Sequence, residues 1–256
     1  MKNLNAVYIL SLLGAKEWIR LKFFHLVIFV AILFIFFSHL LSSLTFAVQE
    51  RLLFDFGLAG LEIGLVFISS LIGSHAIQRE IERKTLLVLL ARPIPRWNIV
   101  MGAWGTLIIL NLIFFLGFSL SFMTSAGFWN LLPGFFIASL SSILKSLVIS
   151  SFALSMGLLV RPMLAFGLSI SYWILCYSLP DIQYFTDKLN NSNLSALVRI
   201  LDNIIPQFYR FNWKTYYAVL NPADVNQIFW VVSHCLAWTT LWLFFAALFF
   251  QRKEVV

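Results

Sequence analysis

The stretch WNIVMGAWGTLIILNLIFFLGFSLSFMTSAGFWNLLPGFFIASLSSIL, residues 97–144, contains no Asp, Glu, Lys or Arg. A helix needs about 20 apolar residues to cross the hydrocarbon core of a bilayer, so this run of 48 residues is too long for one crossing. Residues 124–133 divide it, because they are rich in the turn-forming Thr, Ser, Gly, Asn and Pro. The run predicts two membrane-spanning helices, of which the second contains Lys145 and ends before Arg161.

The rest of the chain shares this apolar composition. Of the 256 residues, 61% are hydrophobic and 11% are charged, whereas a soluble domain carries about 25% charged residues. This excludes a soluble protein and a disordered one, since neither can accommodate so many apolar side chains. The net charge of +7 does not indicate nucleic-acid binding, because the 18 basic residues are dispersed along the chain. The composition is that of an integral membrane protein.

Four further apolar runs bring the prediction to six membrane-spanning helices in an all-α protein. Helices are expected because a backbone in lipid must satisfy its own hydrogen bonds, and no strand-like alternation occurs. The predicted organisation is an N-terminal interfacial helix in 1–22, a six-helix membrane domain over 23–251 and a tail at 252–256. The six expected spans cover 23–49, 56–78, the two halves of 97–160, 163–179 and 225–251.

The distribution of basic residues predicts the orientation of these spans. An even number of spans places both termini on one side of the membrane. Twelve Lys and Arg residues fall on that side and five on the other, while Lys145 lies within a span. The positive-inside rule therefore predicts that both termini are cytoplasmic.

Two segments outside the spans have the periodicity of amphipathic helices. Over 6–22, Lys16 and Arg20 lie opposite an apolar face, which predicts a helix lying on the headgroups; the alternative is a simple extension of the first span. In the outer loop 181–224, residues 194–205 have strong amphipathy. That helix either caps the bundle or offers a gate or docking face to an external partner. The apolar face expected in the first segment comprises Val7, Leu10, Gly14, Trp18 and Leu21.

The sequence predicts no catalytic residue, cofactor site or metal site in this chain. It contains no GxxxxGK[ST], HExxH or GxSxG motif, so ATP hydrolysis through a P-loop of its own is excluded. Its four histidines are scattered without metal-binding spacing. Cys176 and Cys235 lie in apolar runs without a CxxC pattern. We therefore expect that the chain is not an enzyme on its own.

Of the Asp, Glu, Lys and Arg residues in the sequence, Glu62 and Lys145 alone lie inside the expected spans. Charges are costly in hydrocarbon, so both require an explanation. Counted from the outer ends of their spans, Glu62 lies roughly 9 Å deep and Lys145 roughly 18 Å deep. They either form an intramembrane pair, belong to a pathway, or separately reach water or headgroups. Gly60 and Gly64 form a GxxxG motif that permits close helix approach.

The loop 78–97 between the second and third spans is the most informative stretch. It begins with mixed charges, continues as a short apolar helix over 85–91 and is broken by Pro93 and Pro95. This helix is too short to cross a membrane. It either packs beneath the bundle or docks into a groove of a cytoplasmic partner. Its apolar surface would consist of Leu86, Leu87, Leu89 and Leu90.

This loop resembles the coupling segment of bacterial ABC exporter permeases of the "type 2" permease family. Lys84 replaces a Gly that is usual there, and the Lys often seen shortly after the motif is absent at Gly102 and Ala103. The stretch 205–212 is similar to the corresponding sequence of one subgroup, which contains the permease of the nitrous-oxide-reductase maturation system. The positions that match the family pattern are Glu80, Thr85, Leu86, Leu89, Leu90, Arg92, Pro93 and Arg96.

The resemblance implies a multi-pass permease subunit in the bacterial inner membrane, paired with a second copy or a related permease. Two separate ATPase subunits would bind ATP and Mg on the cytoplasmic side and drive substrate export or extraction. An alternative is a membrane anchor that transmits force between an ATPase and a periplasmic partner. A secondary transporter is disfavoured by the lack of an internal repeat. The residues implied to couple with the ATPase are Glu80, Thr85, Leu86, Leu87, Leu89, Leu90, Arg92, Pro93 and Arg96.

Overall fold

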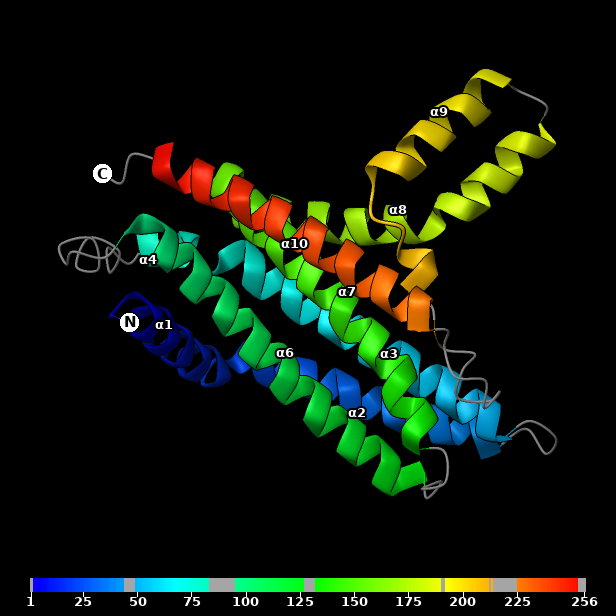
Figure 1. Ribbon diagram of the computed structural model, residues 1–256. Helices are drawn as coiled ribbons and strands as arrows, with labels where there is room; N and C mark the ends of the chain where they lie inside the picture. Colours follow the sequence, from blue (N-terminus) through cyan, green and yellow to red (C-terminus); the bar gives the residue numbers. More distant parts are fainter. Residues whose placement is uncertain are drawn as a thin grey trace.

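The computed structural model describes residues 2–43, 49–82, 95–126, 132–189, 192–211, 213 and 225–252. All regular structure in these residues is helical, and most of the helices run side by side in an elongated bundle (Figure 1). The elements are α1 (Lys2–Ile19), α2 (Lys22–Ser43), α3 (Gln49–His75), α4 (Gln78–Glu82), α6 (Arg96–Ala126), α7 (Leu132–Leu159), α8 (Pro162–Lys188), α9 (Ser192–Ile204), the 3-10 helix η2 (Phe208–Phe211) and α10 (Val225–Arg252).

Five helical stretches within the described residues are long and apolar enough to cross a membrane. They lie in α3 with α4, in α6, in α7, in α8 and in α10. The chain is therefore a multi-pass helical protein of the membrane type. The first expected span, 23–49, corresponds to α2, whose apolar stretch Val27–Leu40 is shorter than the other five. Its crossing of the membrane stays a prediction.

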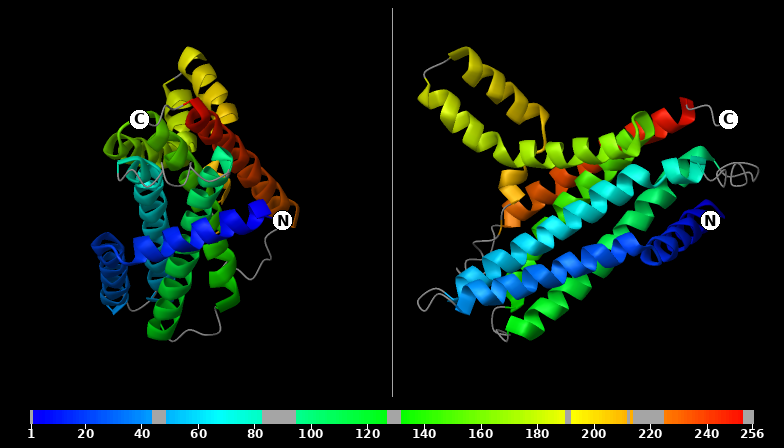
Figure 2. Two further views of the ribbon diagram at one scale, coloured as in Figure 1. Left: turned by 90° about the vertical axis from the view of Figure 1, so that its left-hand side faces the viewer. Right: turned by 180° about the vertical axis from the view of Figure 1, so that it is seen from behind.

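The α4 end of the bundle, as we call the end where α4 lies, also holds α1 and the last turns of α10 (Figure 1). Helix α4 ends here at Glu82. The C-terminal part of α2 and the N-terminal part of α3 lie at the opposite end (Figure 2). The N-terminal helix α1 and the last turns of α10 therefore lie at the same end of the bundle.

The centre of the bundle is the packing of α7 on α3. Gly73 of α3 faces Ala153 of α7, and a Cβ at Gly73 would lie 2.8 Å from the Ala153 Cβ. Gly157 of α7 lies against the backbone carbonyl of Ser74. Small residues thus let the two backbones approach, as expected for helices that associate without a hydrophobic driving force.

The GxxxG motif of α3 makes a different contact. A Cβ on Gly60 would meet the side chain of Phe34 in α2, and one on Gly64 would meet the ring of Phe114 in α6. The two glycines therefore accommodate aromatic side chains from two neighbouring helices. The close approach of backbones occurs instead about two and a half to four turns further along α3, at Gly73 and Ser74.

Helix α7 is rich in serine, and most of its serines are buried. Except for Ser142, their hydroxyls donate to carbonyls three residues earlier in the same helix, so these polar groups need no water. This local bonding allows a polar helix to occupy the centre of the bundle. The serines of α7 that bond in this way include Ser141, Ser146, Ser150, Ser151 and Ser155.

Helix α1 packs on α6. Trp18 is buried, Gly14 lies against Thr106, and Leu10 lies against Gly102. This face is thus buried against α6, where Gly102 leaves room for α1. An interfacial position for α1 stays a prediction. The apolar side chains that α1 leaves exposed are Tyr8, Ile9, Leu12 and Leu13.

Helix α8 extends beyond the predicted limit at 179 and continues to Lys188. Pro180 lies inside it and removes one backbone donor, a common cause of a bend in a helix that continues. Helix α8 is bent along its length (Figure 1). The segment after the bend forms a hairpin with α9 that projects from the bundle (Figures 1 and 2). Val198 of α9 is buried, whereas the other apolar positions on its face include the exposed Leu194, Leu197, Ile200 and Ile204.

Candidate functional site

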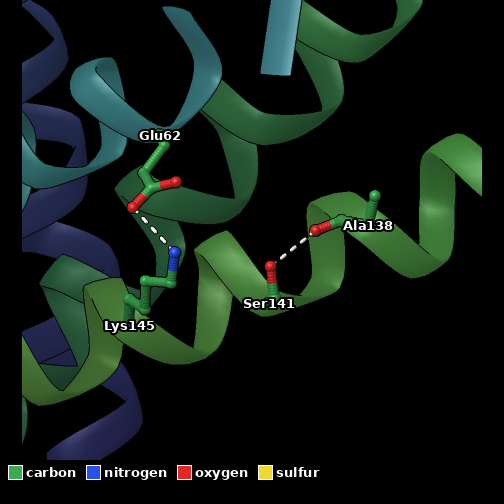
Figure 3. Close-up of polar contacts among 4 residues, drawn as sticks. All are labelled: Glu62, Ala138, Ser141 and Lys145. Atoms are coloured by element: carbon green, nitrogen blue, oxygen red, sulfur yellow. Dashed lines mark hydrogen bonds and ion pairs between the residues drawn. The ribbon is translucent and has the colours of Figure 1, made fainter. Parts of the chain in front are cut away.

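The structure brings Glu62 of α3 and Lys145 of α7 together in the core. The Lys145 Nζ donates a hydrogen bond to the Glu62 Oε1 over 2.8 Å, as Figure 3 shows. Glu62 is 2% exposed and Lys145 is 0% exposed. The close packing of α3 on α7 places both side chains where neither reaches water alone, so each stabilises the charge of the other.

Both members of the pair lie near the middle of their helices. Glu62 follows the first residue of α3, Gln49, by 13 positions and precedes the last, His75, by 13. At a rise of 1.5 Å per residue it is about 20 Å from either end of the helix. The expected span was counted from residue 56, whereas α3 already begins at Gln49. The depth of the pair in a membrane stays a prediction. Lys145 occupies the corresponding middle of α7.

An aromatic side chain completes the surroundings of the lysine. The Lys145 Nζ lies 5.4 Å from the centre of the Tyr177 ring of α8, within the range of a cation–π contact. A buried charge is held in place when both an opposite charge and further favourable contacts surround it. Three helices, α3, α7 and α8, therefore meet at this one ammonium group.

A cavity of about 310 Å³ lies beside the pair, between α3 and α8. Glu62 forms part of its wall, and most of the other lining side chains are apolar or aromatic. It is the point in the described bundle where an ionisable side chain from the core meets a space large enough for a ligand. The lining residues are Ala59, Glu62, Ile63, Trp173, Ile174, Tyr177 and Ser178.

A second polar site lies at the α4 end. Arg79 of α4 forms an ion pair with Glu17 of α1, with 3.3 Å between Nη2 and Oε1. The guanidinium of Arg79 also lies 5.0 Å above the ring of Trp18. Glu80 lines a cavity of about 390 Å³ together with residues of α1 and α6. The segment that precedes the predicted coupling helix is thus attached to the N-terminal helix.

Arg96 begins α6 on the other side of the predicted coupling helix. Its Nη1 donates to the carbonyl of Gln251 over 3.0 Å and to that of Phe250 over 3.4 Å. The last carbonyls of a helix have no partner within it, so Arg96 caps the C-terminal end of α10. The sequence predicted a docking role for this side chain and missed its contact with α10.

The remaining residues predicted to couple with an ATPase lie outside the described residues. The structure places Glu80 in α4 and Arg96 at the start of α6, both at the α4 end of the bundle. The residues whose role stays a prediction without structural description are Thr85, Leu86, Leu87, Leu89, Leu90, Arg92 and Pro93.

A polar cluster that sequence reasoning missed joins α9 and η2 to α10. The side-chain amide of Gln207 donates to Asp202 over 3.1 Å, and its backbone N–H donates to the Nε2 of His234 over 3.5 Å. The guanidinium of Arg210 lies 4.9 Å above the ring of Trp230. The sequence offered one signal: the charged Asp202 precedes Pro206, and the amide-bearing Gln207 follows it. It did not indicate His234 as the partner.

None of these clusters is a metal site, since no three His, Cys, Asp or Glu side chains in the described ranges gather to hold an ion. The arrangement offers a buried ion pair beside a cavity, a fixed frame around a loop, and a projecting hairpin. No family model and no curated protein matches this chain.

Proposed function

We propose that this chain is the membrane-spanning permease subunit of an ABC exporter. It would couple ATP hydrolysis by two separate ATPase subunits to the export or extraction of a substrate across the bacterial inner membrane. In this proposal α2 supplies the sixth span, both termini are cytoplasmic, and a second permease copy or a related chain completes the membrane part. ATP and Mg would be bound by the ATPases, and this chain would not itself be an enzyme.

The observation that carries the proposal is the frame around the loop between α4 and α6. On one side, Arg79 attaches α4 to Glu17 and Trp18 of α1. On the other, Arg96 attaches the start of α6 to the last carbonyls of α10. A partner that pushes on the loop would therefore act on α1, α3, α6 and α10 together. Such a layout suits a segment that passes movement from a cytoplasmic motor to the spans.

The energetic requirement is a difference in affinity between two states of the permease. To shift a population from 1:99 to 99:1, ATP-bound ATPases must favour one state by about 5.5 kcal/mol. A short apolar helix over 85–91 that docks in a groove of the ATPase provides a contact that can differ between the two states.

Co-purification tests this proposal. Leu86→Asp or Leu89→Asp would place a carboxylate without a partner in a buried interface. We expect both variants to insert and dimerise normally but to lose the ATPase. The matched control is Leu189→Asp, which makes the same change at the exposed turn between α8 and α9 and should retain it. Full retention of the ATPase by both loop variants would remove the proposal's main support.

Labelling of single cysteines tests the orientation. Cysteines placed at Lys84 and at Ser192 should react with impermeant reagents from opposite sides of the membrane. Reaction of both from outside would exclude the cytoplasmic loop and with it the docking of an ATPase.

The projecting hairpin favours a second candidate function. Helix α8 continues through its bend and joins α9, which leaves Leu197 and Ile200 exposed. In this version the chain is an anchor that transmits force from the ATPase to a periplasmic partner without moving a substrate. Leu197→Asp with Ile200→Asp should then abolish the activity of the external partner while ATPase binding is retained.

A further inference from the structure

Helix α1 has one face that packs on the bundle and a second face that stays exposed. On the packed side, Trp18 is buried and Gly14 lies against Thr106 of α6. On the exposed side, Ile9 is 54% and Leu13 is 61% accessible. Large apolar side chains that gather on an exposed surface indicate contact with lipid or with another protein.

The exposed face of α1 also carries two cations. Lys16 and Arg20 are both exposed, and their spacing of four residues brings two side chains to the same side of a helix. At 100° per residue, these two and the exposed Ile9, Leu12 and Leu13 fall within an arc of about 100°. The face is therefore apolar along the middle of α1 and basic at its C-terminal end.

The two cations have no counter-charge in the part of the chain that the structure describes. Glu17 is the acidic residue of α1, and it forms an ion pair with Arg79 of α4 over 3.3 Å. Among the described residues, neither Lys16 nor Arg20 takes part in an ion pair. The exposed face thus presents two positive charges to whatever lies outside the chain.

The direction of α1 favours a membrane surface as the partner. Helix α2 follows α1 after a turn at Arg20 and Leu21, and it runs along the bundle beside α3 (Figure 1). In the left view of Figure 2, α1 is seen from its side, whereas α2 is seen nearly along its axis. A helix that lies across the end of a membrane bundle runs along the bilayer surface, where apolar side chains reach acyl chains and basic side chains reach phosphates.

We propose that the exposed face of α1 binds the headgroups of anionic phospholipids. Lys16 and Arg20 would contact the lipid phosphate, and Ile9, Leu12 and Leu13 would lie among the first acyl carbons. The inference goes beyond the proposed function, because it concerns the chain and the bilayer alone. It requires no ATPase and holds for either orientation of the bundle.

Photolabelling of the full-length chain in phosphatidylcholine nanodiscs tests the proposal. The nanodiscs contain a trace of a phospholipid that carries a diazirine beside its phosphate, either a phosphatidylglycerol or a phosphatidylcholine with the same acyl chains. Labelled peptides are mapped by mass spectrometry. We expect the glycerol probe to label residues 8–20 about five- to twenty-five-fold more than the choline probe, since each basic residue contributes about fivefold, or about 1 kcal/mol. Added salt should reduce this ratio.

Two double variants make the labelling test specific. Lys16→Gln with Arg20→Gln should reduce labelling by the glycerol probe to the level of the choline probe. The matched control is Arg161→Gln with Arg252→Gln, which removes the same charge from two other exposed residues and should leave the labelling of α1 unchanged. An excess of inorganic phosphate at constant ionic strength should not compete, because it lacks the acyl chains that the apolar residues bind.

A spin label at Leu12→Cys reports where the exposed face lies. Leu12 is exposed, so its replacement should not disturb the fold, and Cys176 and Cys235 are buried and should not take the label. In nanodiscs we expect the label to be relaxed more by oxygen, which concentrates in lipid, than by a water-soluble nickel chelate. This measurement needs neither of the charge variants.

Four results would overturn the proposal. Equal labelling of α1 by the two probes would show that the lipid charge has no role. A glycerol preference that survives the change of both Lys16 and Arg20 would place the anionic lipid elsewhere. Competition by inorganic phosphate would mean a site for free anions. Access of nickel to Leu12→Cys would mean a face open to water or to a soluble partner. The co-purification experiment decides ATPase docking separately.

Discussion

The apolar stretches of helices α7 and α10 have equal mean hydropathy, but the α7 stretch is mostly buried within the chain and the α10 stretch is mostly not. In the apolar stretch of α7, 67% of the residues are buried within the chain, against 28% in that of α10. The difference lies in the kind of residue rather than in overall hydrophobicity. Helix α7 contains buried serines, Gly157 and Lys145, whereas α10 exposes large side chains such as Phe229 and Phe244.

The comparison teaches how a membrane bundle distributes its residues. Lipid is as apolar as leucine, so burying a large apolar side chain gains little relative to lipid. Small and polar residues gain more from protein contact, because they allow close packing and find hydrogen-bond partners. A helix rich in them lies at the centre, and a helix rich in aromatic and aliphatic residues lies at the surface, where it faces lipid or another chain.

The largest expected difference is between the loss in unfolding free energy when the buried ion pair is broken and the loss when an exposed pair is broken. Glu62→Gln or Lys145→Met should each lower the free energy of unfolding by about 3–5 kcal/mol, because each leaves a buried charge uncompensated. The double variant should cost less than the sum. Thermal melting in detergent measures all three. Arg51→Met breaks the exposed Arg51–Asp55 pair and should cost about 1 kcal/mol or less. Additive effects of the two core changes would contradict the pairing.

The second prediction compares equal truncations of leucine. Leu154 of α7 is 1% exposed, so Leu154→Ala should destabilise by about 2–5 kcal/mol through the cavity it leaves. Leu236 of α10 is 56% exposed, and Leu236→Ala should stay within about 0.5 kcal/mol. Equal losses in unfolding titrations would show that the surface of α10 is covered by a second chain rather than by lipid.

The third prediction concerns two glycines. A methyl group at Gly157 would collide with the backbone carbonyl of Ser74, whereas nothing lies within 4 Å of a Cβ at Gly167 in α8. Gly157→Ala should therefore destabilise by about 1–3 kcal/mol. Gly167→Ala should be neutral or stabilise by up to about 1 kcal/mol, since alanine favours a helix. Melting temperatures of the two variants check this, and destabilisation by both would mean that α8 packs against another chain.

The smallest expected effect is at the end of α10. Arg96→Ala removes hydrogen bonds to two carbonyls and should cost about 1 kcal/mol, mostly by fraying the last turn. Hydrogen exchange should rise in residues 248–252 and stay unchanged in the middle of α10. Unchanged exchange throughout would show that the cap contributes nothing.

Much of the helical organisation could be predicted from the sequence, and the cost of isolated charges in hydrocarbon made a Glu62–Lys145 pair one of the alternatives, which the structure shows. The start of α3 could not be predicted, because charged residues such as Arg51 and Asp55 inside the helix conceal where it begins. Pro180 similarly concealed the continuation of α8, since a proline removes only one donor and a bend can replace a break.

The contacts of single polar side chains were harder to predict. Arg96 has the pattern of an exposed charge beside a loop, yet it binds carbonyls more than 150 residues away in the sequence. The cavity beside Glu62 also depends on α8, whose position relative to α3 no local pattern specifies. Such sites arise from tertiary packing, and sequence periodicity carries no information about them.

The ion pair has a consequence for synthesis. Glu62 and Lys145 are 83 residues apart, so the ribosome, at about 5–20 residues per second, completes the lysine roughly 4–17 s after the glutamate. During that interval α3 carries an acid without its counter-ion. The first helices must therefore wait beside the translocation machinery, in a hydrated or proteinaceous setting, until α7 emerges. Biogenesis of this chain is then a timed assembly, in which a helix becomes stable in lipid only when a later one arrives.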